Sequence, residues 1–502
     1  MEVSLRKSTY PCYQPSYIQT FLLSEGQECV VPDTLPDIAS VICTSAIPLI
    51  RSKDVSDGRV RIEANVPARV TSKGEDGRVF PIDVNIPFYL SAQDEQISGE
   101  SVCTALLTLR QVETRMLNPR KLSVRAELAV TVTCYTQSVL TTYLAPEEDA
   151  SEIHALEQRA NTDCVVCATE KTFVLTDEAE LPETMPPAEE ILAQSAIVSV
   201  GEVRAVGSKI IVNGSVNSAL LYRCTSGALH EFTFRTTFSQ IIESDCEAED
   251  ASVSLSVLLS GVYYEILPGS EMRTFAMELH LVAQAVISKA QEIAFLTDAY
   301  SNRFPLETQS ETLCLTASGN ESVLEESGKA LLETPEEVSE IVFCRAEPIG
   351  IETENADALV RLRITLCYRS GEEYAAAERC VTQKIALPAE EGVDVRVEGA
   401  SVTEISAVPV PGGAEARYTV AVRAVFFSQR EERCIRSICY DEAQSIDNGD
   451  QPTIVMMRVN SRQSLWELAK EHCSTVEAIR SANALDDAAG EWERLLIIPK
   501  AQ

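Results

Sequence analysis

Hydrophobic and polar side chains alternate along much of this chain, and the alternation recurs at a fixed spacing. Every second position is apolar or glycine at residues 60–66, 210–216 and 360–366. A period of two is typical of strands that bury one face and expose the other. Because the three blocks lie 150 residues apart, the pattern predicts three tandem copies of one β-rich unit.

A second signal marks the start of each copy. Threonine and proline, with carboxylates close by, cluster at residues 34–38, 184–188 and 334–338. Proline at the first helical position and acidic residues in the first turn favour a helix, and Thr334 with Glu337 has the spacing of a capping box. We therefore expect a short helix at the start of each copy.

Turn-forming residues separate the strands within each copy. They occupy positions 73–77, 226–227 and 370–371, and again positions 118–119, 268–269 and 411–413. Alternating strands around such turns favour a mainly β fold of antiparallel, sandwich-like repeats over closed barrels. The predicted repeats cover residues 1–150, 151–300 and 301–445, joined by a charged helical segment at 145–161 and a bridge at 291–311.

The last fifty or so residues break this pattern and predict a separate small domain. Residues 455–459 alternate as in a strand, Ser464 and Thr475 stand at helix-cap positions, and residues 495–498 have the composition of a closing strand. The predicted order is β-α-α-β over residues 452–500.

Four short motifs lie in this domain, at residues 464–470 (SLWELAK), 475–479 (TVEAI), 482–483 (AN) and 496–499 (LIIP). Together they resemble the LysM domain. The resemblance implies a shallow groove between the first strand-helix loop and the second helix-strand loop, and binding to N-acetylglucosamine polymers such as peptidoglycan. The polar segment at 445–452 predicts a flexible tether to this domain.

The predicted groove departs from the family pattern at both loops. Arg462, Gln463 and Ser464 stand where LysM domains have Gly-Asp-Thr, and Glu493 with Arg494 replaces Gly-Gln. Glycine allows close approach of a ligand to the backbone, whereas Trp and Arg are frequent in protein interfaces, so the changes favour a protein partner over a glycan. The expected binding residues are Ser461, Arg462, Gln463, Ser464, Asn483, Leu485, Trp492, Glu493 and Arg494.

Residues 36–42, 58–62 and 86–88 carry a second resemblance, to the SPOCS domain of sporulation proteins from spore-forming Firmicutes. SPOCS-like repeats followed by a LysM-like domain resemble clostridial spore morphogenetic proteins. This implies a non-enzymatic adaptor of spore coat and envelope assembly. It would lie in the mother-cell cytoplasm at the forespore surface and dock to the coat-basement ATPase through the LysM-like domain. The alternative is a protein that binds peptidoglycan or spore-cortex N-acetylglucosamine.

Composition narrows the choice of partner. The 502 residues carry a formal net charge of -34, which opposes binding to nucleic acid.

No apolar run approaches the roughly 18 residues of a membrane span, and residues 1–29 lack a signal-peptide pattern, so we expect the chain to stay in the compartment that made it. The 16 cysteines are then expected to be reduced and buried like small hydrophobic residues.

Candidate catalytic groups are sparse. The four histidines lack metal-ligand spacing, and the CxxC pair Cys164 and Cys167 has no second pair to complete a zinc site. The acidic run at residues 243–250 lacks the order of a calcium loop and is interpreted as a solvated loop. We expect no enzymatic activity, metal or cofactor.

Overall fold

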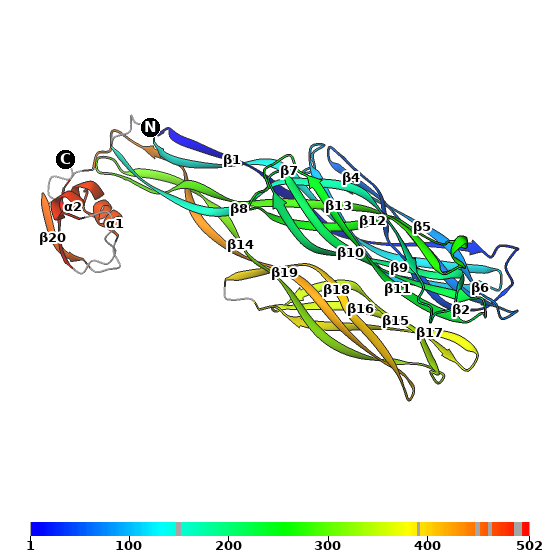
Figure 1. The fold of residues 1–502 in the computed structure, drawn as a ribbon. Coiled ribbons are helices and arrows are strands. Elements are labelled where there is room, and N and C mark those ends of the chain that lie inside the picture. Colours follow the sequence, from blue (N-terminus) through cyan, green and yellow to red (C-terminus); the bar gives the residue numbers. More distant parts are fainter. Residues whose placement is uncertain are drawn as a thin grey trace.

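The computed structural model describes residues 2–146, 152–388, 392–446, 452–459, 464–485 and 494–500. The fold is mainly β, with a broad strand-built body and a small helical module at one end of its long axis (Figure 1). Within the described ranges, no helix is long and apolar enough to cross a membrane.

The strands of the body fall into three groups along the chain. The first strand set consists of β1 (Leu5–Val30), β2 (Ile38–Ala46), β3 (Leu49–Ser56), β4 (Arg59–Gly74), β5 (Val79–Gln93), β6 (Val102–Asn118) and β7 (Lys121–Pro146). The second consists of β8 (Ile153–Glu180), β9 (Ala188–Val206), β10 (Lys209–Cys224), β11 (Leu229–Glu243), β12 (Ser252–Ile266) and β13 (Thr274–Ser301). The third consists of β14 (Leu306–Glu333), β15 (Glu340–Glu354), β16 (Asp357–Ser370), β17 (Glu373–Ala386), β18 (Val393–Val410) and β19 (Gly413–Tyr440).

The same antiparallel pairing occurs in each set. The first strand pairs with the last, and the last with the one before it, giving β1-β7-β6, β8-β13-β12 and β14-β19-β18. The remaining strands form a second sheet, centred on β4, β10 or β16. β1 and β8 also pair at Tyr13 and Val165, which joins the first two long sheets. The residue boundaries given above for the repeats stay predictions.

Within each set the two sheets face each other and share a core. In the third set, Val360 and Leu362 from β16 lie in one cluster with Val420 and Val422 from β19, and all four are fully buried. The alternating positions seen in the sequence are therefore the inward-facing side chains of a two-layer sandwich.

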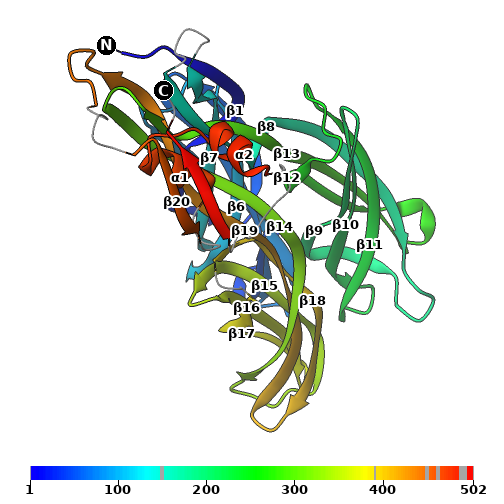
Figure 2. The ribbon, with the colours of Figure 1, turned by 90° about the vertical axis from the view of Figure 1, so that its left-hand side faces the viewer.

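The second sheets also bury side chains on their outer faces, where the three sets meet. Ile42 from β2, Leu192 from β9 and Phe343 from β15 belong to one buried cluster, together with Leu221 from β10 and Cys367 from β16. We call this cluster the central core. Seen from the end that carries the module, the second set spreads to one side of the body and the third set spreads downward (Figure 2).

A buried ion pair and a hydrogen bond accompany the central core. Arg345 of the third set lies 2.7 Å from the Glu231 carboxylate of the second, and both side chains are mostly buried. Burial raises the pKa of Glu231, although the charge of Arg345 opposes this. The backbone N–H of Leu229 donates to the Tyr374 hydroxyl at 3.2 Å. These directional contacts fix how the second and third sets meet.

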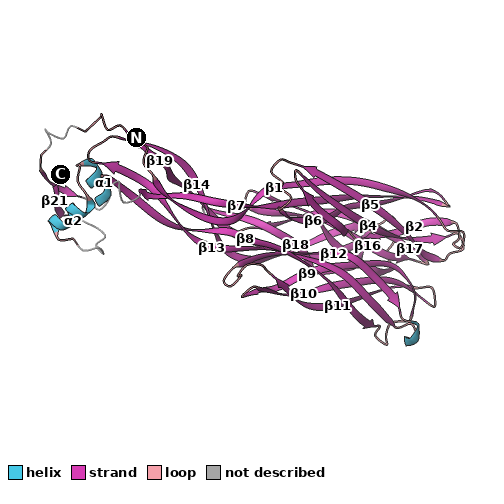
Figure 3. Cartoon of the chain, turned by 90° about the horizontal axis from the view of Figure 1, so that it is seen from above, coloured by secondary structure: helices cyan, strands magenta, loops and turns pink. Residues whose placement is uncertain are grey.

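The longest strands continue beyond the sandwiches as three two-stranded ribbons, β1 with β7, β8 with β13 and β14 with β19, which run toward the module (Figure 3). The ribbons pack on one another. Phe295 of β13, Leu313 of β14 and Cys434 of β19 form one buried cluster, and Tyr10 of β1 and Leu140 of β7 pack against it. We call this part the ribbon bundle.

The helices predicted at the start of each copy are wrong. Residues 34–38 and 184–188 form turns that lead into β2 and β9, and residues 334–338 form a bend before β15. Thr, Pro and Asp are turn formers as well as helix-start residues, and a residue before proline is disfavoured in the α region. The residues that follow each proline alternate with a period of two, which indicates a strand rather than a helix.

The predicted connections are also corrected. β7 continues to Pro146 and β8 begins at Ile153, so the described part of 145–161 is extended rather than helical, while 147–151 lies outside the described residues. Most of 291–311 belongs to β13 and β14. Of the predicted tether, Ile446 hydrogen-bonds to the Arg303 carbonyl at 2.8 Å, and 447–451 is not described.

The expectation that every cysteine is reduced is wrong for one pair. Cys103 in β6 and Cys134 in β7 stand directly opposite each other and form a disulfide. The other 14 cysteines lie outside any disulfide, and two of them, Cys314 and Cys380, are exposed rather than buried. Cross-strand proximity, which single-sequence reasoning does not provide, explains the difference.

We predict that Phe295→Ala destabilises the chain, because the fully buried ring fills the space between the ribbons. The expected loss is about 3–5 kcal/mol of unfolding free energy, measured by chemical denaturation of the full chain. Leu22→Ala, at a side chain that is 70% exposed, should change stability by less than about 0.5 kcal/mol. Equal unfolding midpoints for the two variants would contradict the ribbon packing.

Candidate functional site

The C-terminal module consists of β20 (Ile454–Val459), α1 (Leu465–Glu471), α2 (Val476–Asn483) and β21 (Arg494–Pro499), with β20 antiparallel to β21. α1 begins with a capping box: Ser464 Oγ accepts the N–H of Glu467 at 3.1 Å, and the Glu467 carboxylate accepts the N–H of Ser464 at 3.0 Å. Thr475 caps α2 by accepting the N–H of Ala478 at 3.0 Å. Each helix is therefore capped at its N-terminus by the side chain of the residue that precedes it.

Six of the nine expected binding residues cannot be placed with their side chains. They are Ser461, Arg462, Gln463, Trp492, Glu493 and Arg494, of which Arg494 begins β21 and the others lie outside the described residues. The groove expected between the two loops therefore stays a prediction.

The other three expected binding residues hold the module together. Ser464 is the α1 cap described above. Asn483 donates from Nδ2 to the Ile479 carbonyl at 2.8 Å and accepts the N–H of Ile497 at its Oδ1 at 2.7 Å. Leu485 packs against the module core. Asn483 thus joins α2 to β21.

Helix α1 attaches the module to the end of the ribbon bundle. The indole N–H of Trp466 donates to the Asp298 carboxylate at 2.8 Å, and Lys470 Nζ lies 2.8 Å from both carboxylate oxygens. Burial acts to raise the pKa of Asp298, but the hydrogen bonds from Lys470 and Trp466 outweigh it, so this pKa lies below its ordinary value. One carboxylate of β13 therefore holds two side chains of α1.

Tyr300, two residues further along β13, is part of the module's own core. Its ring is 6% exposed and meets Trp466 edge-on, with 4.8 Å between ring centroids. Its hydroxyl donates to the Ser474 carbonyl at 3.0 Å, and Asn302 Nδ2 donates to the same carbonyl at 3.2 Å. Polar and aromatic contacts together fix the module on the bundle. Sequence reasoning missed this attachment.

The outer face of the β20–β21 sheet is mainly apolar and exposed, with Arg458 as its one charged residue among those the structure describes. Ile454, Met456 and Leu495 are 58%, 60% and 57% exposed. In the strand register, Met456 lies opposite Ile497, and Arg458 lies opposite Leu495. We call these five residues the outer sheet face. Two helices cover the opposite face of the sheet, so the module presents this one to solvent.

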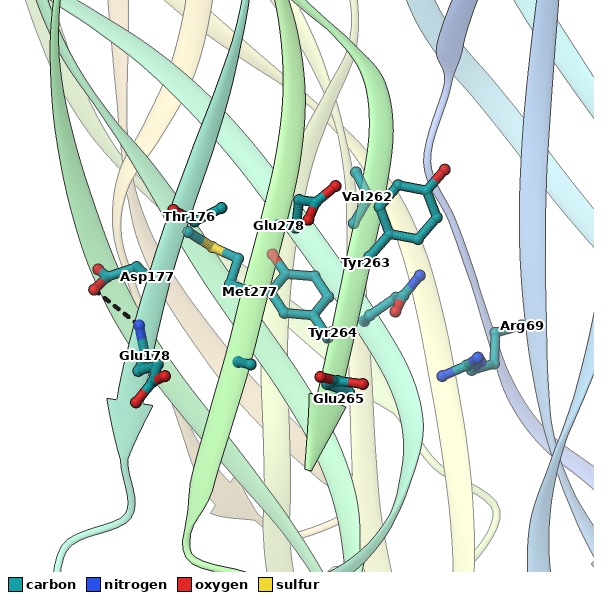
Figure 4. Close-up of a pocket in the computed structure, with 12 residues that line it drawn as sticks. Arg69, Thr176, Asp177, Glu178, Val262, Tyr263, Tyr264, Glu265, Met277 and Glu278 are labelled. Carbon is teal, nitrogen blue, oxygen red and sulfur yellow. Dashed lines mark hydrogen bonds between the residues drawn. The ribbon is translucent and has the colours of Figure 1, made fainter. Parts of the chain in front are cut away.

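A second candidate site is an open pocket of about 690 Å³ beside the second strand set (Figure 4). Its lining includes Asp177 and Glu178 of β8, Tyr263 and Glu265 of β12, Glu278 of β13 and Arg69 of β4. Two of these carboxylates already have hydrogen-bond partners: Asp177 accepts from the Thr236 hydroxyl at 2.7 Å, and Glu278 lies 2.7 Å from His280. An acidic wall beside a tyrosine ring suits a cationic group.

No cluster of three or more His, Cys, Asp and Glu side chains that could hold a metal ion occurs among the residues whose placement is described. The titratable groups with raised pKa values near the pocket are structural. Burial raises the pKa of Tyr264 to about 12, and its hydroxyl lies 2.7 Å from that of Ser218. The pocket therefore offers a charged surface rather than an activated nucleophile.

Comparison with known families gives a match in the second strand set. The family model described as SipL, SPOCS domain, matches residues 187–267. The matched stretch runs from the start of β9 to the end of β12, and its strands correspond in pairing to those that carry the resemblance in the first set. The chain therefore contains a region similar to the SPOCS domain, which indicates a sporulation-related protein. No curated protein and no solved structure matches the chain.

We predict that Asp298→Ala detaches the module from the ribbon bundle. The chain has two tryptophans, so in a Trp492→Phe background the emission comes from Trp466 alone. Loss of the carboxylate should move that emission to longer wavelength as the indole becomes hydrated. Glu183→Ala, at an exposed carboxylate in a turn of the body, serves as the matched control. Identical emission in both variants would contradict the attachment.

The attachment should also depend on pH. Because the folded-state pKa of Asp298 is lowered, its contribution is fully present above the unfolded value of about 3.9 and is lost as pH falls through the folded value. The same Trp466 emission, followed in an acid titration, should shift below pH 4 in the parent. An Asp298→Asn chain that shows the same acid transition would assign it to other groups.

Proposed function

We propose that this protein is a non-enzymatic scaffold and adaptor in spore coat and envelope assembly, which docks to a coat morphogenetic protein through its C-terminal module. The observation that carries the proposal is the outer sheet face. Ile454, Met456 and Leu495 leave more than half of their side-chain surface in water on a module of about fifty residues. Apolar side chains gathered on one exposed face are typical of protein interaction sites.

The charge distribution supports docking at the module rather than elsewhere. Residues 452–500 contain six Lys and Arg against seven Asp and Glu, so almost all of the net charge of -34 belongs to the body. An acidic partner, or a second copy of the chain, would be repelled by the body but not by the module. The partner can therefore bury the outer sheet face without opposing charge.

The attachment of α1 supports the same role. Trp466 and Lys470 face the ribbon bundle, which leaves the β20–β21 sheet on the exposed side of the module. A module seated this way presents its apolar face at a fixed position on the body. This arrangement is what an adaptor needs, because docking then orients the strand sets relative to the partner.

The similarity of residues 187–267 to the SPOCS domain supports the sporulation setting. Within that setting we propose the mother-cell cytoplasm, at the forespore surface, as the location, and the coat-basement ATPase as the partner, because the LysM-like motifs at residues 464–470 and 496–499 resemble those of spore morphogenetic proteins. Glycan binding at the same module remains the alternative that an experiment must separate.

We predict that Met456→Glu abolishes partner docking, because it places a charge at the centre of the outer sheet face. Tagged full-length chain recovered from sporulating cells should carry at least about tenfold less partner, equivalent to about 1.4 kcal/mol of binding free energy. Val323→Glu, at an equally exposed apolar residue of β14, is the control and should bind normally. Circular dichroism of both variants verifies the fold.

Full partner recovery by folded Met456→Glu would contradict docking at this face. Co-sedimentation of the parent chain with purified peptidoglycan tests the alternative. Sedimentation that depends on residues 452–500 would favour glycan binding.

A further inference from the structure

Two thiols from distant parts of the chain meet in the second strand set. Cys167 lies in β8, and Cys246 lies in the loop between β11 and β12. The hydroxyl of Ser244 lies between them, donating to Sγ of Cys167 at 3.7 Å and standing 3.1 Å from Sγ of Cys246. The same hydroxyl accepts the backbone N–H of Cys246 at 3.1 Å. One serine thus holds the two sulfur atoms side by side.

The two thiols differ in access. Cys167 is 8% exposed, whereas Cys246 is only partly buried. Burial, opposed by the Ser244 hydroxyl, raises the pKa of the Cys167 thiol, and Cys246 raises it further through its charge and a hydrogen bond. A reagent from solution therefore meets Cys246 first, with Cys167 behind it as the resolving thiol.

Cys164 shares the CxxC spacing with Cys167, but its thiol has different neighbours. Burial raises the pKa of the Cys164 thiol to about 11, and the charged neighbours that add to this are Cys12 and Asp163. The partner of Cys167 is instead the thiol that shares Ser244 with it. The contacts of Cys167 thus favour Cys246 over Cys164.

The first strand set has hydroxyls in the equivalent loop, between β5 and β6. The Ser101 hydroxyl accepts the N–H of Ser98 at 3.0 Å and lies 2.7 Å from the Thr136 hydroxyl, which in turn lies 2.8 Å from that of Ser16. Hydroxyls anchor a loop permanently, whereas a thiol pair can also be oxidised. The 244–251 loop of the second set therefore has a chemical option that the β5–β6 loop of the first set lacks.

We propose that Cys167 and Cys246 form a reversible disulfide in response to a hydroperoxide, and that this bond locks the acidic loop 244–251 onto β8. The Cys246 thiolate attacks the peroxide oxygen, the O–O bond breaks, and Cys246 becomes a sulfenic acid. The Cys167 thiolate then attacks that sulfur and displaces hydroxide. Two thiols lose two hydrogens and two electrons, and hydrogen peroxide is reduced to two waters.

The loop is suited to such control. Its middle residue, Ala248, is fully buried, and its backbone N–H donates to the Gly207 carbonyl at 2.7 Å, while Glu247 and Glu249 on either side are exposed. Because residues 167 and 246 are distant in sequence, the bond would hold the loop and β8 together whenever the loop opens. The local acidic surface would then be fixed in one position.

The test uses the full chain, reduced and then treated with hydrogen peroxide. After free thiols are alkylated under denaturing conditions, peptide mass spectrometry should detect the 167–246 link, about 2 Da lighter than the sum of the two reduced peptides. A Cys164→Ser background removes the neighbouring thiol, so the linked residue is unambiguous. A dithiol reductant should abolish the link. Cleavage of the loop by a Glu-specific protease should slow at least fivefold on oxidation.

Two variants keep the test decisive. Cys246→Ser should remain folded, because serine fits a half-exposed loop site, and should lose both the link and the protease protection. Cys12→Ser should keep both. A link from Cys246 to any other cysteine, a Cys164–Cys167 link in the oxidised parent chain that keeps Cys164, or equal protease rates before and after oxidation would overturn the proposal.

Discussion

The structure depends on burial at the central core. The second sheet of each strand set buries one face against its own sandwich, and part of its other face carries buried residues such as Leu192, Phe343 and Cys367. No single set can bury both faces, so the three sets cover one another. The Arg345–Glu231 ion pair adds a directional contact between the second and third sets. Because both side chains are mostly buried, moving the two sets apart would leave unpaired charges in the interior.

Mutual burial also explains the ribbon bundle and the seat of the module. With the sandwiches fixed around one core, their long strands emerge close together and bury Phe295 between them. β13 then ends where Asp298 and Tyr300 hold α1. Packed contacts therefore continue from the central core through the ribbon bundle to the module. The outer sheet face lies at the exposed end of this series of contacts.

Local patterns predicted the strands well, because a period of two is a property of neighbouring residues such as Val360 and Leu362. The helices predicted at residues 34–38, 184–188 and 334–338 were wrong because proline and threonine also form turns. The period of two in the residues that follow is what distinguishes a strand from a helix there. The meeting of the three strand sets around Cys367 and Phe343 could not be predicted. A single sequence does not distinguish the apolar residues that face out of a sandwich from those that face into it. The Asp298–Trp466 contact could not be predicted either, because it joins residues far apart in the chain. The sequence placed the binding site in the loops around Arg462 and Trp492, and did not indicate that Met456 is exposed on the sheet.

Amide hydrogen exchange of full-length Phe343→Ala tests the shared core most directly. Phe343 belongs to β15 of the third set, but its cluster includes Ile42 of β2 and Leu192 of β9. If the three sets depend on one another, the substitution should speed exchange in β2 and β9 as well as in β15. Faster exchange confined to β15, β16 and β17 would mean that the third set stands alone, and would contradict the account.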